Sequence, residues 1–277
     1  MGITRRAFLK GGVVIGGALL FDGIFVEPRF FKAEETVVKV AGLPRPFDGF
    51  KICQVTDIHH GMALDIAYVE QCVKAANALD PDVTVLTGDY VESNKKYFPE
   101  AVKRLAALRA RHGVYAVLGN HDYYAGASHA LKAFHEHDIP VLMNGHVVIE
   151  DNGSRLCVAG VREFIEDRAD ASAALRGAPA DAPVVLLSHH PDYAELLPPD
   201  MRVDLVVSGH THGGQIRLPF SRYAPVVPSM YGQKYTGGLV RSERGVQVYV
   251  SRGLGAAVIP VRFNCPPELT LLVLAPS

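Results

Sequence analysis

Two histidines separated by one residue, His210 and His212, are the side chains best suited to chemistry in this sequence. They follow the apolar run 203–207, which has the composition of a buried strand, and they lie in the glycine-rich turn 208–215. From such a turn, two imidazoles can reach two neighbouring points at once, a geometry that suits two adjacent metal ions. A His-x-His pair in a surface turn can equally be without function. The metal hypothesis therefore depends on matching ligands elsewhere in the chain.

Four further apolar runs also end in side chains that can bind metal. The runs span residues 50–56, 83–87, 114–118 and 184–188. The polar residues that follow them are Asp57 and His59, Asp89, Asn120 and His121, and His189. Because sites in α/β sheets form at the carboxyl ends of strands, we expect these tips and the 208–215 turn to converge in one crevice.

Helical patterns separate several of these strands. Apolar residues recur at helical spacing from Ile66 to Ala76. Further helices are expected at about 99–111, near 128–136 and just before Gly177. The other expected elements are an edge strand at 36–40 after a linker at Glu34-Glu35, a strand pair at 147–150 and 155–161, and a further sheet from 246–250 and 269–274. The alternation predicts an α/β protein.

The collected tips resemble the motifs of the calcineurin-like metallophosphoesterase superfamily, which run D-x-H, G-D, G-N-H-[DE], H and G-H-x-H. All five occur here in order, between Asp57 and His212. The resemblance implies a four-layer α/β/β/α sandwich of two mixed β-sheets flanked by helices, with the metal site at the C-terminal strand ends. Residues 213–219, GGQIRLP, further resemble the exported or membrane-associated phosphodiesterase branch.

Carried over by motif, the resemblance implies a centre of two divalent metal ions. One ion would be held by Asp57, His59, Asp89 and His212. The other would be held by Asp89, Asn120, His189 and His210. Two cations about 3.5–4 Å apart repel, so the shared Asp89 carboxylate is needed between them. Oxygen and nitrogen ligands without thiolate favour manganese as the first expectation, with iron or zinc as alternatives.

The expected activity is that of a metal-dependent phosphoesterase, a hydrolase that acts on phosphodiester or pyrophosphate bonds. A hydroxide that bridges the two metals would attack phosphorus. His121 is the expected general acid, with Asp122 orienting and charging it; the alternative for His121 is a structural histidine beside the site. A lipid-linked substrate such as UDP-2,3-diacylglucosamine is one expectation. A non-catalytic scaffold and a nuclease of the same superfamily are the alternative functions.

The remaining histidines and one apolar loop have weaker assignments. His60 and His190 each follow an expected ligand and are assigned either to the surroundings of the site or to packing. Five others are expected at the surface: His112, His129, His135, His137 and His146. No role is assigned to Arg162-Glu163, where members of the superfamily often carry an acidic pair. The 220–231 segment is either an apolar lid over the site or a packed loop.

The N-terminus resembles a twin-arginine export signal. Arg5 and Arg6 precede a glycine-interrupted apolar run, 11–25, which is shorter than the roughly 20 residues that a spanning helix needs. The alternative is a chance Arg-Arg pair before a short transmembrane helix. We expect a signal or membrane anchor at 1–35, the metallophosphoesterase domain at 36–277, and a location in the periplasm or cell envelope. The expected partners are the twin-arginine translocation machinery, a phosphate-ester small molecule or lipid, and a membrane at the N-terminus.

The composition allows one substantial domain. The chain has 277 residues, 48% of them hydrophobic, and a formal net charge of -1, so no global field favours nucleic acid as a partner. The four cysteines, Cys53, Cys72, Cys157 and Cys265, have no C-x-x-C spacing. Buried free thiols are therefore expected, rather than a disulfide or a zinc site.

Overall fold

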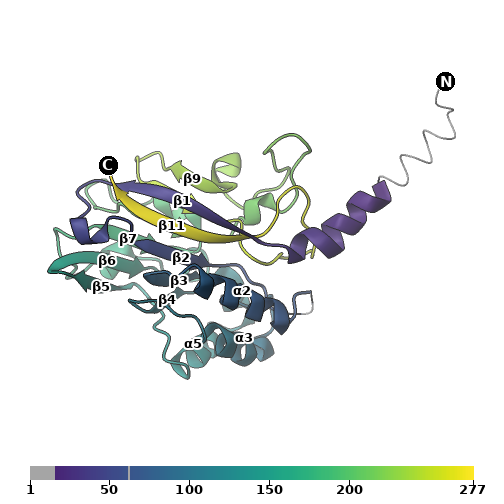
Figure 1. Ribbon diagram of the computed structural model, residues 1–277, viewed down its shortest axis with the longest axis horizontal. Helices are drawn as coiled ribbons and strands as arrows, with labels where there is room; N and C mark the ends of the chain where they lie inside the picture. Colours follow the sequence, from purple (N-terminus) through teal and green to yellow (C-terminus); the bar gives the residue numbers. More distant parts are fainter. Residues whose placement is uncertain (1–15, 62) are drawn as a thin grey trace.

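The computed structural model describes residues 16–61 and 63–277. Two mixed β-sheets pack together and are flanked by helices, which confirms the expected fold class (Figure 1). The four cysteines are buried and free, as expected. The Arg5-Arg6 pair of the expected export signal lies outside the described residues.

The first sheet has five strands and carries three of the five expected site tips. In spatial order its strands are β1 (Lys32–Val40), β11 (Glu268–Pro276), β2 (Lys51–Val55), β3 (Val83–Thr87) and β4 (Val114–Val117). β2, β3 and β4 run parallel, so their carboxyl ends share one edge. An apolar core attaches α2 (Ile66–Ala78), α3 (Phe98–Leu105) and α5 (Ala127–His135) to the sheet.

The second sheet has six strands and carries the other two tips. In spatial order these are β5 (Gly145–Asp151), β6 (Ser154–Gly160), β7 (Val184–Leu187), β8 (Leu205–Ser208), β10 (Gln247–Val250) and β9 (Gly238–Arg241). The four strands from β6 to β10 run parallel, and β5 and β9 are antiparallel edges. A second apolar core contains α6 (Ala171–Ala174) and flanks this sheet.

The interface between the two sheets is apolar except near the site. Side chains from both sheets, such as Val85 and Val207, share one buried cluster. Near the strand tips the buried Gln54 of β2 donates to Thr87 Oγ1 at 2.7 Å and to the Ser208 carbonyl at 2.9 Å. This amide therefore connects the two sheets next to the residues expected to bind metal.

Three expectations from the sequence are corrected by the structure. The strands near the C-terminus do not form a further sheet: β11 inserts between β1 and β2, and β10 between β8 and β9. Their nearly continuous burial is typical of interior strands. The pair Glu34-Glu35 is not a linker but part of the edge strand β1, opposite Thr270 and Leu271. This strand begins at Lys32, whereas the expected division of the chain at 35/36 stays a prediction.

The third correction concerns α3, which ends at Leu105 instead of near residue 111. The Asn77 side chain of α2 donates to the Ala107 carbonyl at 2.9 Å and accepts from the Arg109 backbone amide at 2.8 Å. These bonds hold residues 107–109 against α2, so the helix cannot continue along its own axis.

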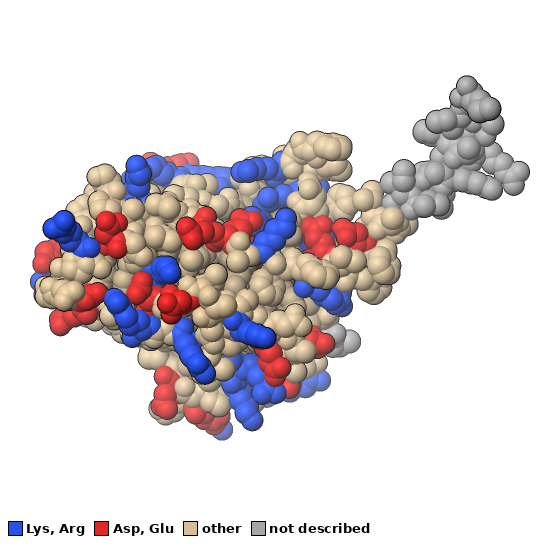
Figure 2. Space-filling model, in the orientation of Figure 1, with Lys and Arg blue, Asp and Glu red and all other residues tan. Residues whose placement is uncertain are grey.

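The charged side chains on the visible face are mixed in sign. Figure 2 shows Lys and Arg interspersed with Asp and Glu, without a continuous basic track. This face therefore offers no extended complement to a phosphate backbone.

Candidate metal centre and active site

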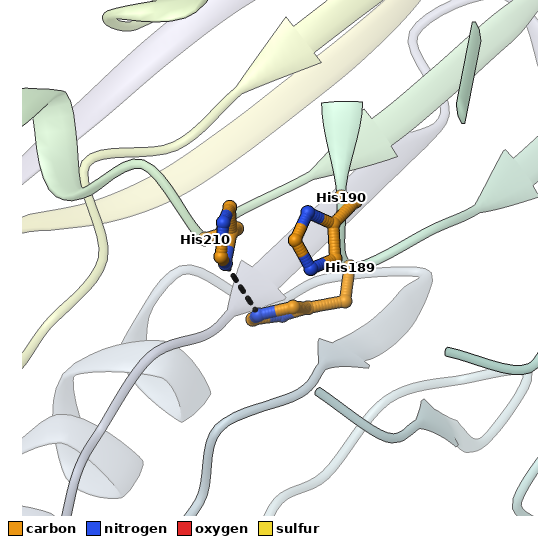
Figure 3. Close-up of side chains that lie close together, drawn as sticks. All are labelled: His189, His190 and His210. Carbon is orange, nitrogen blue, oxygen red and sulfur yellow. Dashed lines mark hydrogen bonds between the residues drawn. The ribbon is translucent and has the colours of Figure 1, made fainter. Parts of the chain in front are cut away.

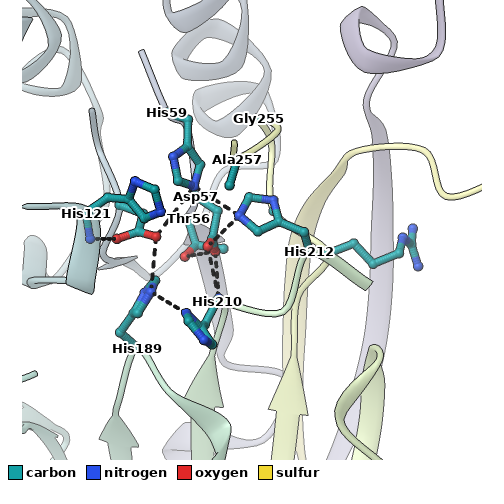
Figure 4. Close-up of polar contacts among 12 residues, drawn as sticks. Thr56, Asp57, His59, His121, His189, His210, His212, Gly255 and Ala257 are labelled. Carbon is teal, nitrogen blue, oxygen red and sulfur yellow. Dashed lines mark hydrogen bonds and ion pairs between the residues drawn. The ribbon is translucent and has the colours of Figure 1, made fainter. Parts of the chain in front are cut away.

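Five strand tips from the two sheets meet at one place (Figure 4). Beyond β2 and β3, the backbone amides of Asp57 and His59 bond to the carbonyls of Gly88 and Asp89 at 2.9 and 3.0 Å. Beyond β7 and β8, Gly209 donates to the His189 carbonyl at 3.1 Å. The tips are thus held in register past the ends of the regular strands.

One group of ligand-type atoms combines Asp57, His59, Asp89 and His212, all of them buried. His212 Nε2 lies 3.0 Å from His59 Nε2 and 3.3 Å from Asp57 Oδ1. His59 Nε2 lies 3.5 Å from Asp89 Oδ2. Two carboxylates and two imidazoles directed at one point fit a divalent cation. The structure therefore contains a candidate metal site made from the residues expected for the first ion.

A second group shares the Asp89 carboxylate with the first. His189 Nε2 lies 3.2 Å from Asp89 Oδ2 and 3.0 Å from Asn120 Oδ1. His210 Nδ1 lies 3.0 Å from the same Asn120 oxygen. All seven expected ligands therefore come together, with Asp89 Oδ2 close to both groups, and their individual roles as ligands stay predictions.

Charge and burial favour the metal-binding forms of Asp57, His210 and His212. Burial raises the pKa of Asp57, but His212 and His189 outweigh it and hold this pKa below its ordinary value. Burial lowers the pKa of His212 to about 4, with His59 and Arg262 acting in the same direction against Asp57. Burial also lowers the pKa of His210 well below its ordinary value. Ionised carboxylates therefore face these two imidazoles, which are neutral near pH 7.

His189 differs from these two histidines. Burial lowers its pKa, but the nearby Asp89 carboxylate outweighs this effect and raises the pKa of His189 to about 10. The Asp89 carboxylate and the His189 imidazole, 3.2 Å apart, therefore stabilise each other's charged forms. Burial also lowers the pKa of His59, but the hydrogen bond to Glu92 and the Asp89 carboxylate outweigh this effect and raise that pKa.

The backbone is unusual at most of the expected ligands. Left-handed φ angles occur at Asp57 (51°), His59 (48°), Asp89 (55°), His210 (67°) and His212 (51°). Such a conformation costs of order 1–3 kcal/mol at a non-glycine residue and is concentrated at functional sites. The tips of β2, β3 and β8 therefore turn sharply after their strands, which directs their side chains into the centre.

Two glycines let the tips approach one another. A Cβ atom on Gly209 would overlap Asp57 Oδ2 and Thr56 Oγ1, and one on Gly119 would overlap Asp89 Oδ1. Both glycines precede an expected ligand in its motif. Glycine is thus required at these positions because no side chain fits beside the carboxylates.

Asp122 does not contact the His121 ring that it was expected to orient. It lies in α4 (Asn120–Ala125), and its fully buried carboxylate accepts from the backbone amides of Asp89, Tyr90 and Gly119 at 2.8, 3.0 and 2.9 Å. Burial and the nearby Asp89 raise the pKa of Asp122 to about 7, although these amides act against the shift. Asp122 therefore fixes the β3 tip rather than the His121 ring, whose Nδ1 bonds to the Glu92 carbonyl.

Glu92 is a residue near the centre that the sequence reasoning missed. Its Oε2 atom lies 2.8 Å from His59 Nδ1, the ring nitrogen opposite the one that faces the metal group. Its backbone carbonyl holds His121. A carboxylate behind a ligand histidine fixes the tautomer and the orientation of the ring. No motif contains Glu92, and its only signal is a position three residues after Asp89.

Glu163 and Arg262 were also not assigned from the sequence. Glu163 is buried, with Oε1 2.8 Å from His190 Nε2, and the His190 ring stacks on His210 with centroids 3.6 Å apart (Figure 3). Arg262 is fully buried, with Nη2 3.3 Å from His212 Nδ1. Its guanidinium also donates to carbonyls of the 252–265 loop. Arg262 thus supports the expected ligand His212 directly, whereas Glu163 acts through His190, which packs on the expected ligand His210.

The other histidines lie away from the centre. His60 is buried, but its Nδ1 bonds to the Leu64 carbonyl at 2.9 Å and its ring packs on Tyr97. The five histidines expected at the surface are exposed or half-buried, and none belongs to a metal-binding group among the described residues.

An apolar pocket of about 620 Å³ opens beside the centre. Asp89, Asn120, His121, His210 and His212 line its polar side. Its apolar side comes from Pro225, Val226 and Pro228 of the expected lid segment and from Ala257, Val258 and Ile259, which the sequence reasoning did not single out. The 220–231 segment thus contributes part of the pocket wall.

Comparison with known proteins decides the family. Residues 50–214, which include all five motifs, match the model of the calcineurin-like phosphoesterase family. The chain is a calcineurin-like phosphoesterase. It is 32% identical to an uncharacterized metallophosphoesterase, YkuE, of Bacillus subtilis, over 98% of each chain. It is 28% identical to the UDP-2,3-diacylglucosamine pyrophosphatase LpxG of Chlamydia trachomatis, over 83% of this chain and 86% of that protein.

A solved structure shares the fold of this phosphoesterase. The match to a 5′-nucleotidase precursor from Thermus thermophilus has a TM-score of 0.51 at 15% identity. It covers 82% of this chain and 54% of that one, so this phosphoesterase spans about half of the nucleotidase. The family places the protein among the metal-dependent hydrolases.

The close approach at Gly209 generates a prediction. Gly209→Ala should displace the Asp57 carboxylate and lower the bound metal content, with a loss of unfolding free energy of about 1–3 kcal/mol. Elemental analysis and thermal unfolding measure the two effects. The control is Gly145→Ala, because a Cβ at Gly145 meets no atom within 4 Å. Full metal content in Gly209→Ala would contradict this account.

The contact between Glu92 and His59 generates a second prediction. Glu92→Gln should weaken metal binding by about 10- to 100-fold, because the amide replaces the charged partner of the ligand ring. Competition with a metal-binding dye measures the affinity. Glu100→Gln is the control, since Glu100 lies 3.8 Å from His60, outside the centre. Equal affinities for the two variants would exclude the positioning role.

Proposed function

We propose that the protein is a two-metal phosphohydrolase that cleaves phosphodiester or pyrophosphate bonds. The observation that carries the proposal is the position of Asp89 Oδ2, which lies 3.5 Å from His59 Nε2 and 3.2 Å from His189 Nε2. One buried carboxylate can thus serve both donor groups. When bound, two divalent cations supply the Lewis acidity that activates water and polarises a phosphoryl group.

His121 is the proposed general acid. Its ring is half-buried, lines the pocket and packs edge-on against His59, with centroids 4.6 Å apart. Nδ1 donates to the Glu92 carbonyl, so Nε2 is the nitrogen left to deliver a proton. A leaving alkoxide or phosphate in the pocket could receive that proton.

The pocket supports a substrate with an apolar part. Its proline, valine and isoleucine wall lies directly beside the donor groups, so a phosphoryl group and a hydrocarbon chain could bind together. The similarity to LpxG makes UDP-2,3-diacylglucosamine one compound to test. We propose a lipid-linked phosphodiester or pyrophosphate as the substrate class. Oxygen and nitrogen donors without thiolate support manganese first, then iron or zinc.

The cellular location is part of the same proposal. The Arg5-Arg6 pair before the apolar run 11–25 supports export by the twin-arginine machinery to the cell envelope, with the segment before β1 as signal or anchor. In the part of the chain that the structure describes, no helix has both the length and the apolar character needed to span a bilayer.

The shared carboxylate gives the first test of the function. Asp89→Asn should lose most of the bound metal and nearly all hydrolysis of bis-p-nitrophenyl phosphate, because the amide carries no charge to offset two cations. Elemental analysis and initial rates measure the outcome, with the surface variant Asp181→Asn as the control. Full metal content with normal turnover would refute a bridging role.

The proposed acid gives the second test. His121→Ala should keep both metals but lose about 100-fold or more in kcat on alkyl phosphodiesters, and far less on nitrophenyl esters, whose leaving group needs little protonation. His129→Ala, an exposed position on α5, is the control. Equal losses on both substrate types would indicate that His121 positions the substrate instead.

A further inference from the structure

Exposed apolar side chains gather around the pocket mouth. Single exposed hydrophobic residues are ordinary, but a contiguous group marks an interaction surface. Seven large hydrophobic residues of this kind come from two loops, 218–230 and 257–260, and are here called the rim. The rim consists of Leu218, Phe220, Tyr223, Val226, Met230, Val258 and Ile259.

The rim is continuous with the active-site pocket. Val226, Val258 and Ile259 line the pocket together with His210 and His212. Anything that covers these three side chains also covers the way to the candidate metal centre.

The rim is also continuous with the N-terminal segment. Phe220 and Leu19 line one further hollow beside Phe263. The N-terminal segment, residues 16–26, is helical and projects beyond the sheets (Figure 1). Four of its apolar side chains are exposed: Leu19, Leu20, Phe21 and Phe25. The segment is fixed to the body, because the Arg262 amide donates to the Gly23 carbonyl at 2.9 Å. Apolar side chains of the rim and of the N-terminal helix therefore border one hollow, whose lining also includes Asp22, Glu27, Arg222 and Asn264.

Two rim residues adopt a backbone conformation that folding alone does not favour. Phe220 and Val258 have φ angles of 60° and 63°, a region that bulky and β-branched residues avoid. Phe220 is fully exposed and Val258 is 83% exposed, so no burial offsets the strain. Strain of this kind persists mainly where a ligand or partner makes use of it.

We propose that the rim and the N-terminal segment dock on the surface of a phospholipid bilayer, so that the pocket opens onto the lipid. A second copy of the chain is a poorer occupant, because it would cover the pocket without supplying a substrate, whereas a bilayer would cover it with lipid. Arg222, exposed two residues after Phe220, lines the hollow at the N-terminal segment. A cation beside an apolar surface suits anionic headgroups above acyl chains.

The docking itself does not depend on the chemistry of the site. Its consequence, that a lipid-linked substrate enters from the bilayer, rests on the proposed function. Side chains on the rim would insert among the headgroups, and the phosphoryl group of such a substrate would lie at the level of the metal centre.

Tryptophan fluorescence tests the docking, because the chain has no tryptophan. Full-length Phe220→Trp is mixed with vesicles of phosphatidylglycerol and phosphatidylethanolamine, with or without brominated acyl chains. We expect its emission to shift to shorter wavelength and to be quenched by the brominated lipid. Leu196→Trp is the matched control, since Leu196 is also exposed but lines neither the pocket nor the hollow at the N-terminal segment. Its emission should not change.

A second variant measures the energetic contribution of the rim. The double substitution Phe220→Ser and Met230→Ser should weaken vesicle binding in sedimentation by at least about tenfold, through the loss of apolar burial. Neither residue lines the pocket, so hydrolysis of a soluble nitrophenyl diester should be unchanged.

Three results would overturn the docking proposal: unchanged Phe220→Trp emission with vesicles, a blue shift that grows with protein concentration without vesicles, or unweakened binding by the double variant. The second result would assign the rim to a second copy of the chain. Hydrolysis of the soluble diester in any of these cases leaves the proposed function standing. If the protein docks on vesicles but hydrolyses no phosphoester, the docking proposal stands and the proposed function is wrong.

Discussion

The centre depends on a single buried carboxylate that two groups of donors share. Asp89 lies at the tip of β3, and its Oδ2 atom faces His59 from its own sheet and His189 from the other. Such a position exists only if the edges of both sheets are held close together. Gln54 provides one connection between them, and Asp122 holds the backbone of Asp89 itself. The sandwich can therefore be understood as the frame that keeps one carboxylate between two sets of ligands.

The sequence predicts the parts of the fold that local pattern determines. The strands that carry the site and the helices between them follow from apolar runs, period and turn residues, and the structure confirms them. The positions of β10 and β11 could not be predicted, because strand pairing over long distances leaves no local signal. The end of α3 depends on a contact from Asn77, a residue 28 positions before Leu105. It could not be predicted either, because this contact leaves no local signal in the sequence.

In the site, too, residues with a local sequence signal could be predicted and residues that act through distant contacts could not. Residues in the motifs could be named in advance and are brought together, because each follows directly from its own strand. Glu92, Glu163 and Arg262 could not, because each acts through a spatial contact with a histidine from another segment. Asp122 was named but given the wrong partner. Its place in the motif is explained equally well by the three backbone amides that it binds.

The place of β11 in the first sheet has a consequence for the timing of assembly. Residues 268–276 separate β1 from β2, so the sheet is divided until this segment arrives. Every residue expected to bind metal precedes it in the chain. A ribosome therefore delivers all the ligands before it delivers the strand that stabilises their sheet. The first sheet is consequently completed only after this late strand has emerged, as one of the final events of folding.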